Sequence, residues 1–354
     1  MTLNQILSNI TPADRAAAAA CKTRWDLIAH PLGSLGLLEQ QVQQLAGIFR
    51  TADLPDLHPR ALVAMCADNG VVAQGVSQSP QEITAVVTEN FSRGTTCMCR
   101  MAKQADVTVI PVDVGVCRPC TGDRILDRCV IRGGTRDMSL GPAMTREEAE
   151  QALLVGLELA GDLKNRGYKL LATGEMGIGN TTTSSALAAL LLGKDVEAVT
   201  GRGAGLTSAG LERKIAVIKQ AIAVNQPDPA DPLDCLHKVG GLDIAALAGL
   251  CLGGALHRIP VVLDGFISCI AALVAVRLCP AAADYLLASH VSAEPAGKWV
   301  LEALGKQAPI QAGLRLGEGS GAVCAIPLLD MALAVYRDSG SFAESAIDPY
   351  QPLH

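Results

Sequence analysis

The chain has 354 residues, of which 49% are hydrophobic and 18% charged, enough to bury one large α/β core and a smaller appendage. A net charge of −6 without any run of Lys or Arg argues against nucleic-acid binding, because phosphate backbones are bound by clustered basic side chains. The most apolar run, residues 244–256, is shorter than the about 20 residues that cross a bilayer, so we expect no membrane span.

The N-terminal segment predicts a cytoplasmic protein. It lacks the basic region followed by an apolar stretch that is typical of a signal peptide. The twelve Cys are then expected to be free thiols, mostly in the core. The pairs Cys97/Cys99 and Cys117/Cys120 are an alternative metal site, but the first pair is too close for a zinc knuckle and no second CxxC or HxxxH follows. We therefore expect no metal and no cofactor.

Short apolar runs that end in a polar or acidic residue recur along the chain and suit strands buried on both faces of a parallel sheet. They cover residues 61–68, 107–115, 168–175, 259–264, 285–290 and 310–318. Helical patterns lie between and after them, at residues 146–163, 183–192, 211–224, 243–256, 266–278 and 322–336. This alternation predicts an α/β fold with a doubly wound, mostly parallel sheet.

The two ends of the chain have helical patterns and lie outside the predicted strands. We expect residues 1–55 and 325–354 to pack together as a small helical domain. Residues 56–324 then form the large α/β domain.

Polar side chains end the predicted strands, at the sheet edge where such folds bind ligands. They are Asp68, Asp113, Glu175, Asp264, His290 and Glu318. Helix capping explains each one alone equally well. Five carboxylates at one edge, however, repel one another unless a ligand or a hydrogen-bond donor offsets their charge.

The stretch GEMGIGNTT (residues 174–182) follows a predicted strand and opens a predicted helix, which is the setting of a phosphate-binding loop. Gly177 and Gly179 allow a ligand to approach the main chain, and Thr181 adds a hydroxyl donor. Asn180 stands where a nucleotide-hydrolysing P-loop carries Lys, which argues against ATP hydrolysis. A Gly-rich turn with a Thr cap is the alternative interpretation.

Two further glycine turns contain candidate residues. In TGRGAGL (residues 200–206) the turn precedes Lys214, which is either a point charge for phosphate or a solvated surface lysine. In LRLGEGSGA (residues 314–322), Glu318 is either a general base with a raised pKa or a solvated loop residue.

Several motifs, in order along the chain, resemble the nicotinate-nucleotide:dimethylbenzimidazole phosphoribosyltransferase family. They include ADNGVVAQGVSQSPQEIT, RGTTC, GEMGIGNTTT, KVGGLDIAALAG, LDGFIS, SHVSAE and LRLGEGSGAV. The resemblance implies a Rossmann-like large domain, a small helical domain built from both termini, and a homodimer whose partner subunit completes each active site. It also implies transfer of 5-phosphoribose from nicotinate mononucleotide to an aromatic base, which releases nicotinate and gives an α-riboside phosphate.

The resemblance also assigns residues. Glu318 matches the general base, and Glu175 falls on the family's phosphate and ribose loop. We expect Glu175 to be a second catalytic residue, since strand-end carboxylates can stabilise the positive charge that develops on the ribose. The matching nucleotide- and phosphate-binding positions are Gly177, Asn180, Thr181, Gly203, Lys214, Asp264 and Ser292. Ser79 matches a serine that contacts the acceptor base.

Two positions depart from the family pattern. Many family members carry Gln where this chain has Val87, and they usually carry His where it has Asn69. Val87 removes a polar contact, so we hypothesise an altered preference that extends to other benzimidazoles, purines or phenolics. Family members that use phenolics are heterodimers of two homologous chains, which makes a phenol or p-cresol enzyme the alternative. A non-catalytic partner subunit and a P-loop hydrolase are the more distant alternatives.

Overall fold

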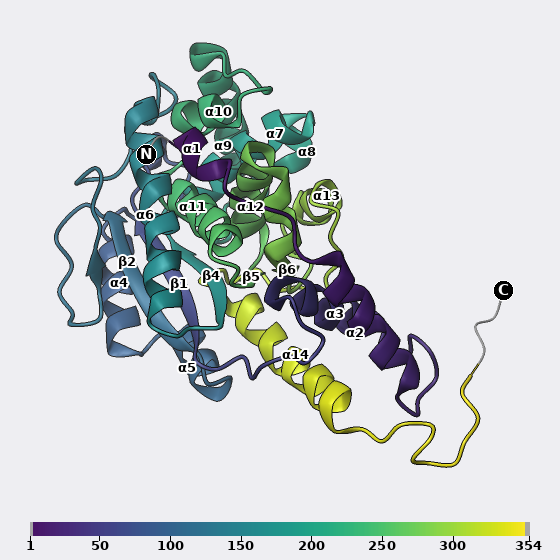
Figure 1. The fold of residues 1–354 in the computed structure, drawn as a ribbon. Helices are drawn as coiled ribbons and strands as arrows, with labels where there is room; N and C mark the ends of the chain where they lie inside the picture. The colour runs from purple at the N-terminus through teal and green to yellow at the C-terminus, as the bar shows by residue number, and fades with distance from the viewer. Residues whose placement is uncertain (1–2, 351–354) are drawn as a thin grey trace.

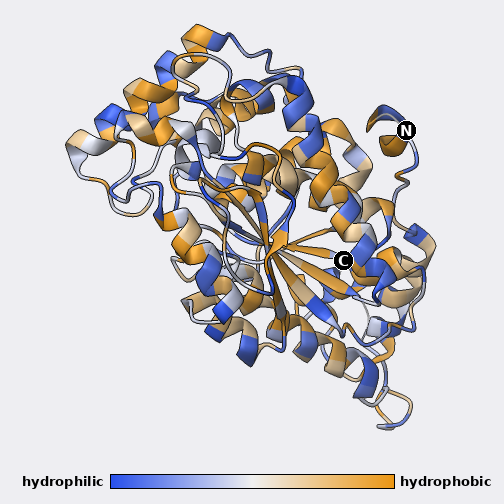
Figure 2. Cartoon of the chain, turned by 90° about the vertical axis from the view of Figure 1, so that its left-hand side faces the viewer, coloured by the Kyte–Doolittle hydropathy of each residue, from blue (hydrophilic) through white to orange (hydrophobic). Residues whose placement is uncertain are grey.

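The computed structural model describes residues 3–350, and their centre is a six-stranded parallel sheet (Figures 1 and 2). The strand order is β3-β2-β1-β4-β5-β6. The strands are β1 (Arg60–Ala67), β2 (Thr108–Gly115), β3 (Leu126–Asp127), β4 (Leu170–Met176), β5 (Val261–Leu263) and β6 (Leu286–Ala288). Because the order reverses between β1 and β4, the sheet is doubly wound, which confirms the predicted fold class.

Helices cover both faces of the sheet. They are α1 (Leu3–Leu7), α2 (Arg15–Leu27), α3 (Leu37–Phe49), α4 (Ile83–Arg93), α5 (Cys97–Gln104), α6 (Arg146–Asn165), α7 (Asn180–Leu192), α8 (Val196–Val199), α9 (Ser208–Asn225), α10 (Pro232–Val239), α11 (Leu242–Leu256), α12 (Phe266–Leu278), α13 (Gly297–Ala303) and α14 (Ser320–Asp338). Short 3-10 helices lie at Gly70–Gln74 and Pro280–Tyr285.

Strand β1 is buried along its whole length, so its side chains join two cores in alternation. Val63 and Met65 pack in the core that includes α6 and α11, whereas Leu62 and Ala64 pack in the core that includes α4 and α14. Helices α6 and α11 approach closely through glycines, since a Cβ on Gly156 would lie 1.9 Å from the Ala246 carbonyl oxygen. The apolar run that predicted this strand is therefore the centre of both cores.

Helices α2, α3 and α14 lie together at one end of the molecule, whereas α1 lies apart from them and packs against the large core (Figure 1). The Trp25 ring of α2 lies 5.1 Å from the Tyr336 ring of α14, and Ile28 forms a β-bridge with Ser341. Helix α14 itself runs from the sheet edge into this group, so the expected boundary at residue 325 falls inside one helix. The division into domains 1–55 with 325–354 and 56–324 stays a prediction.

The expected strand at residues 310–318 is wrong. Only Ile310 pairs, in a single bridge to His290, and the following segment is irregular. Gly313, Gly317 and Glu318 have φ values of 65°, 80° and 63°, which no β-strand contains. This turn is what presents Glu318 at the sheet edge.

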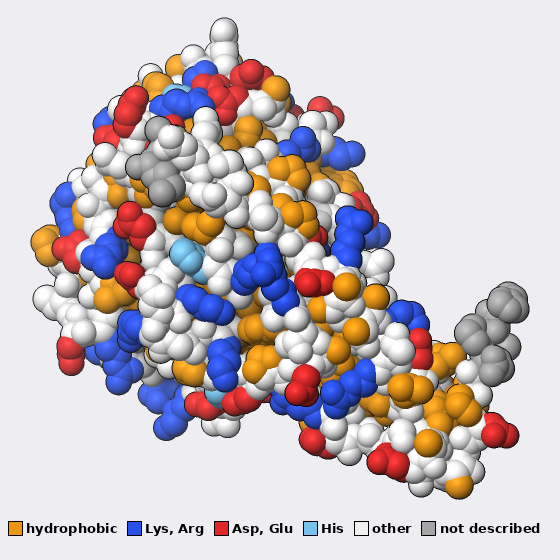
Figure 3. Space-filling view, in the orientation of Figure 1, with side chains coloured by type: hydrophobic (Ala, Val, Ile, Leu, Met, Phe, Trp, Pro, Cys, Tyr) orange, Lys and Arg blue, Asp and Glu red, His pale blue; other side chains and the backbone are white. Residues whose placement is uncertain are grey.

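Helix α14 is the one helix within residues 3–350 that has the length and apolar composition of a membrane span. However, 56% of that window is buried inside the protein, as in a core helix. On the face shown in Figure 3, Lys and Arg side chains are interspersed with Asp and Glu.

Candidate active site

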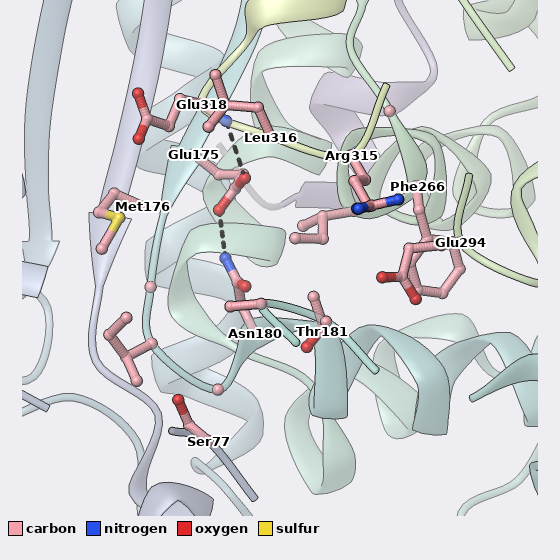
Figure 4. A pocket seen from close by; sticks show the side chains of 18 of the residues that line it. Ser77, Glu175, Met176, Asn180, Thr181, Phe266, Glu294, Arg315, Leu316 and Glu318 are labelled. Atoms are coloured by element: carbon pink, nitrogen blue, oxygen red, sulfur yellow. Dashed lines mark hydrogen bonds between the residues drawn. The ribbon is translucent and has the colours of Figure 1, made fainter. Parts of the chain in front are cut away.

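A cleft of about 320 Å³ opens at the carboxyl ends of β1, β4 and β5, beside the point where the strand order reverses. Figure 4 shows part of its lining. Met176 and Glu318 lie at one side of this view, and Arg315, Phe266 and Glu294 lie at the other. One side of this view therefore carries the Glu318 carboxylate, and the other carries Arg315 and a second carboxylate, Glu294.

The predicted glycine loop forms the floor between these sides. It leaves β4 at Met176 and starts α7 at Asn180, so Gly177, Ile178 and Gly179 line the cleft with their main chain. Gly179 has φ of 92°, which favours glycine, and its carbonyl begins the helix. The N–H groups of Ile178, Asn180 and Thr182 already donate to Thr84 Oγ1 and to the carbonyls of Gly177 and Gly179. Binding of an anion at this helix N-terminus therefore stays a prediction.

Glu318 stands in the turn before α14 and is held there by two other carboxylates. Its backbone N–H donates to Glu175 Oε1 at 3.2 Å. Asp264 accepts hydrogen bonds from the N–H groups of Gly319 (3.1 Å) and Gly321 (2.7 Å), so it caps α14. These contacts stabilise the left-handed backbone of Glu318, which is strained for a residue with a side chain.

The electrostatics at Glu318 suit a proton acceptor. Burial raises the pKa of Glu318 above its ordinary value, and a hydrogen bond from the Thr96 hydroxyl opposes this rise. Glu318 Oε2 is buried and has no hydrogen-bond partner within residues 3–350. The carboxylate can therefore accept a proton from a ligand at a pH closer to neutrality than an exposed Glu.

Glu175 belongs to a buried polar cluster that the sequence did not reveal. The Asn180 side-chain amide donates to Glu175 Oε2 and, at 3.0 Å, to Asp243 Oδ2. Burial and the adjacent Asp243 carboxylate raise the pKa of Glu175 to about 8. Asp243 is the second residue of α11 and was part of the GLDIAALAG stretch, where an acidic residue reads simply as a helix start.

Lys214 is fully buried, so the alternative of a solvated surface lysine is wrong. Its Nζ donates to Thr181 Oγ1 at 2.9 Å and to the Gly201 carbonyl at 3.2 Å. Thr181 and Gly203 line the cleft, and Lys214 supports them from behind. Burial lowers the pKa of Lys214 to about 8. Its predicted role as the charge that meets phosphate stays a prediction.

Arg315 and Arg202 are cleft-lining cations that the sequence interpretation missed. Arg315 lines the cleft as an exposed side chain, and its charge lies close enough to act on the pKa of Glu294. Its signal was its position three residues before Glu318, in LRLGEG, but a lone Arg in a loop is usually solvated.

Of three further predicted site residues, two line the cleft and one does not. Ser292 lines the cleft, and its Oγ accepts from the Glu294 N–H at 3.3 Å. Val87 also lines it, and so adds an apolar side chain to the wall. Ser79 is outside the lining, and its N–H donates to the hydroxyl of Ser77, which lines the cleft instead.

The strand-end carboxylates do not all meet at the cleft. Asp68 accepts from the Cys117 N–H at 2.6 Å, and Asp113 forms an ion pair with Arg132 at 2.6 Å. Both of these contacts tie down the segment after β2. The twelve Cys are free thiols, and no group of His, Cys, Asp and Glu within residues 3–350 is arranged to hold a metal ion.

Comparisons with known proteins identify the family. A family model described as Phosphoribosyltransferase matches residues 10–347. The chain is 46% identical over the full length of both proteins to the nicotinate-nucleotide–dimethylbenzimidazole phosphoribosyltransferase of Ruminiclostridium cellulolyticum, and 43% identical, again over both full lengths, to that of Clostridium acetobutylicum. The crystal structure of CobT from Thermus thermophilus is similar with a TM-score of 0.89 and 41% identity, covering 95% of this chain and 100% of that chain. The chain therefore belongs to the nicotinate-nucleotide:dimethylbenzimidazole phosphoribosyltransferase family.

Proposed function

We propose that this phosphoribosyltransferase moves 5-phosphoribose from nicotinate mononucleotide to dimethylbenzimidazole or a close analogue. The products are nicotinate and an α-riboside 5′-phosphate. The observation that supports this most is that Glu318 lines the same cleft as a helix N-terminal glycine loop and has a buried carboxylate oxygen, Oε2, without a hydrogen-bond partner within residues 3–350. The proposal also agrees with the names of the relatives, which match this chain along its whole length.

Different residues of the cleft have different roles in this reaction. The phosphate binds at the glycine loop and Thr181, where Arg315 adds a positive charge. The unprotonated ring nitrogen of the acceptor attacks C1′ of the ribose, and Glu318 removes the proton from the other ring nitrogen, so that the product base is neutral. The bond from C1′ to the pyridinium nitrogen breaks, and its electron pair returns to the ring of the departing nicotinate. Glu175 faces the positive charge that develops on the ribose.

Val87 gives the acceptor an apolar neighbour, which suits the methyl groups of dimethylbenzimidazole. The names of the relatives do not favour the phenol-type heterodimer. A cytoplasmic location, a homodimer and the two-domain division remain part of the proposal. The homodimer and the two domains follow from the family resemblance, and the location follows from the lack of a signal-peptide pattern.

The test is an activity assay with the purified chain, nicotinate mononucleotide and a panel of benzimidazoles, purines and phenols, with products separated by chromatography and identified by mass spectrometry. We expect an α-riboside phosphate of dimethylbenzimidazole without any second chain. Absence of transfer to every base in the panel would overturn the proposed function.

A further inference from the structure

The amide of Asn180 has a fixed orientation. Its nitrogen carries two hydrogens, and each meets a carboxylate, Glu175 on one side and Asp243 on the other. Both carboxylates are buried, with 6% and 0% of their surfaces exposed. A rotated amide would place Oδ1 against two acceptor oxygens and leave them without donors, which is costly for buried groups.

Asp243 decides this orientation more firmly than Glu175 does. Because the pKa of Glu175 is raised to about 8, its carboxyl is largely protonated at neutral pH, and a protonated carboxyl can donate to Oδ1 as well as accept from Nδ2. Burial raises the pKa of Asp243 only to about 6, so Asp243 is ionised and can only accept. Asp243 itself lies on α11, outside the cleft lining, and acts through Asn180.

The consequence lies on the cleft side of Asn180. This residue lines the cleft, and no hydrogen bond within residues 3–350 reaches its Oδ1 (Figure 4). A ligand must therefore present a donor at this point. In nicotinate mononucleotide the carboxylate and the ionised phosphate only accept, so the ribose hydroxyls are the donors.

We infer that Asp243 is a positioning residue that fixes Asn180 as an acceptor, and that Asn180 Oδ1 binds a ribose hydroxyl of the nucleotide. This deepens the proposed function and rests on it. The cleft would thereby select ribonucleotides over analogues that lack this hydroxyl.

The experiment compares Asp243→Ala with the unmodified enzyme on three substrates, namely nicotinate mononucleotide and its 2′-deoxy and 3′-deoxy analogues. We expect kcat/KM for the ribonucleotide to fall about 10- to 100-fold, and for the analogue without the bound hydroxyl by less than about threefold. For each substrate the loss is the ratio of kcat/KM in the unmodified enzyme to kcat/KM in the variant. Differences in intrinsic reactivity between the analogues therefore cancel. Asp243→Asn keeps an acceptor oxygen and should recover most of the lost activity.

Asp195→Ala is the matched control, since Asp195 is exposed and its side chain does not cap α8. Equal losses on all three nucleotides would overturn the inference and leave the proposed function intact. If Asp243→Ala does not fold, as judged by circular dichroism, Asn180→Ala is measured in the same way and must show the same selective loss. An unmodified enzyme that transfers no phosphoribose would overturn the proposed function and this inference with it.

Discussion

Replacing Glu318 with Gln keeps the size of the side chain and removes its ability to take a proton. The backbone contacts that hold this residue, from its own N–H to Glu175 and from Gly319 and Gly321 to Asp264, do not involve the carboxylate. We therefore expect the turn and the nucleotide site to survive. Loss of a general base lowers kcat by about 100- to 10,000-fold, or about 3 to 5 kcal/mol in the activation barrier.

The assay is steady-state transfer to dimethylbenzimidazole, with KM for nicotinate mononucleotide measured alongside kcat. We expect KM to change less than about threefold, because the nucleotide contacts other groups. In the unmodified enzyme kcat should fall as the pH drops through the raised pKa of Glu318, and this acidic limb should vanish in the variant. Glu212→Gln, at an exposed position on α9, is the control. A variant with at least a tenth of normal kcat would refute the general-base assignment.

Three further substitutions test the electrostatics and shape of the cleft. Glu175 has an ordinary pKa of 4.5 and a folded pKa of about 8, so between these values the folded chain holds a proton that the unfolded chain releases. Stability should therefore fall as pH rises from about 5 to 8, and Glu175→Gln should lose this trend in calorimetry; a parallel Tm profile in both proteins would contradict it. Arg315→Ala should raise KM for the nucleotide about tenfold in steady-state assays, with Arg315→Lys intermediate, whereas an unchanged KM would place the phosphate elsewhere. Val87→Gln should lower kcat/KM for dimethylbenzimidazole about three- to tenfold relative to a hydroxylated benzimidazole, and an unchanged ratio in competition assays would remove Val87 from the acceptor wall.

The sequence pattern predicted secondary structure well for segments with a regular pattern of buried apolar residues. Strands β1 and β4 and helix α6 (Arg146–Asn165) are examples, because their buried residues recur along the whole element. Residues 310–318 failed since their apolar residues alternate with glycines that adopt positive φ, a choice set by contacts with Glu175 and Asp264. Such contacts join segments far apart in the chain.

The same limit explains what was missed at the site. Lys214 was predicted as a site residue, but its burial behind Thr181 could not be predicted, because an isolated Lys on a helix is usually solvated. From the sequence, Asp243 is explained as an acidic residue that stabilises the start of a helix. Its hydrogen bond with Asn180 exists because α7 packs beside α11, which the sequence did not predict. Family resemblance supplied roles for matched positions, but not the contacts that decide how each position acts.

Four carboxylates gather at this sheet edge, and their differing partners separate their roles. Asp264 accepts hydrogen bonds from the amides that begin α14, and Asp243, outside the cleft lining, accepts from the Asn180 amide. Glu175 lowers the local repulsion by keeping a proton up to a pH of about 8. Two carboxylate oxygens of this group, Asp243 Oδ1 and Glu318 Oε2, are buried without a hydrogen-bond partner within residues 3–350, and of these two residues Glu318 lines the cleft and Asp243 does not. Glu318 is thus the carboxylate that we expect to take a proton from a ligand, because Asp264 accepts backbone hydrogen bonds from the start of α14 and Glu175 keeps its own proton up to a pH of about 8.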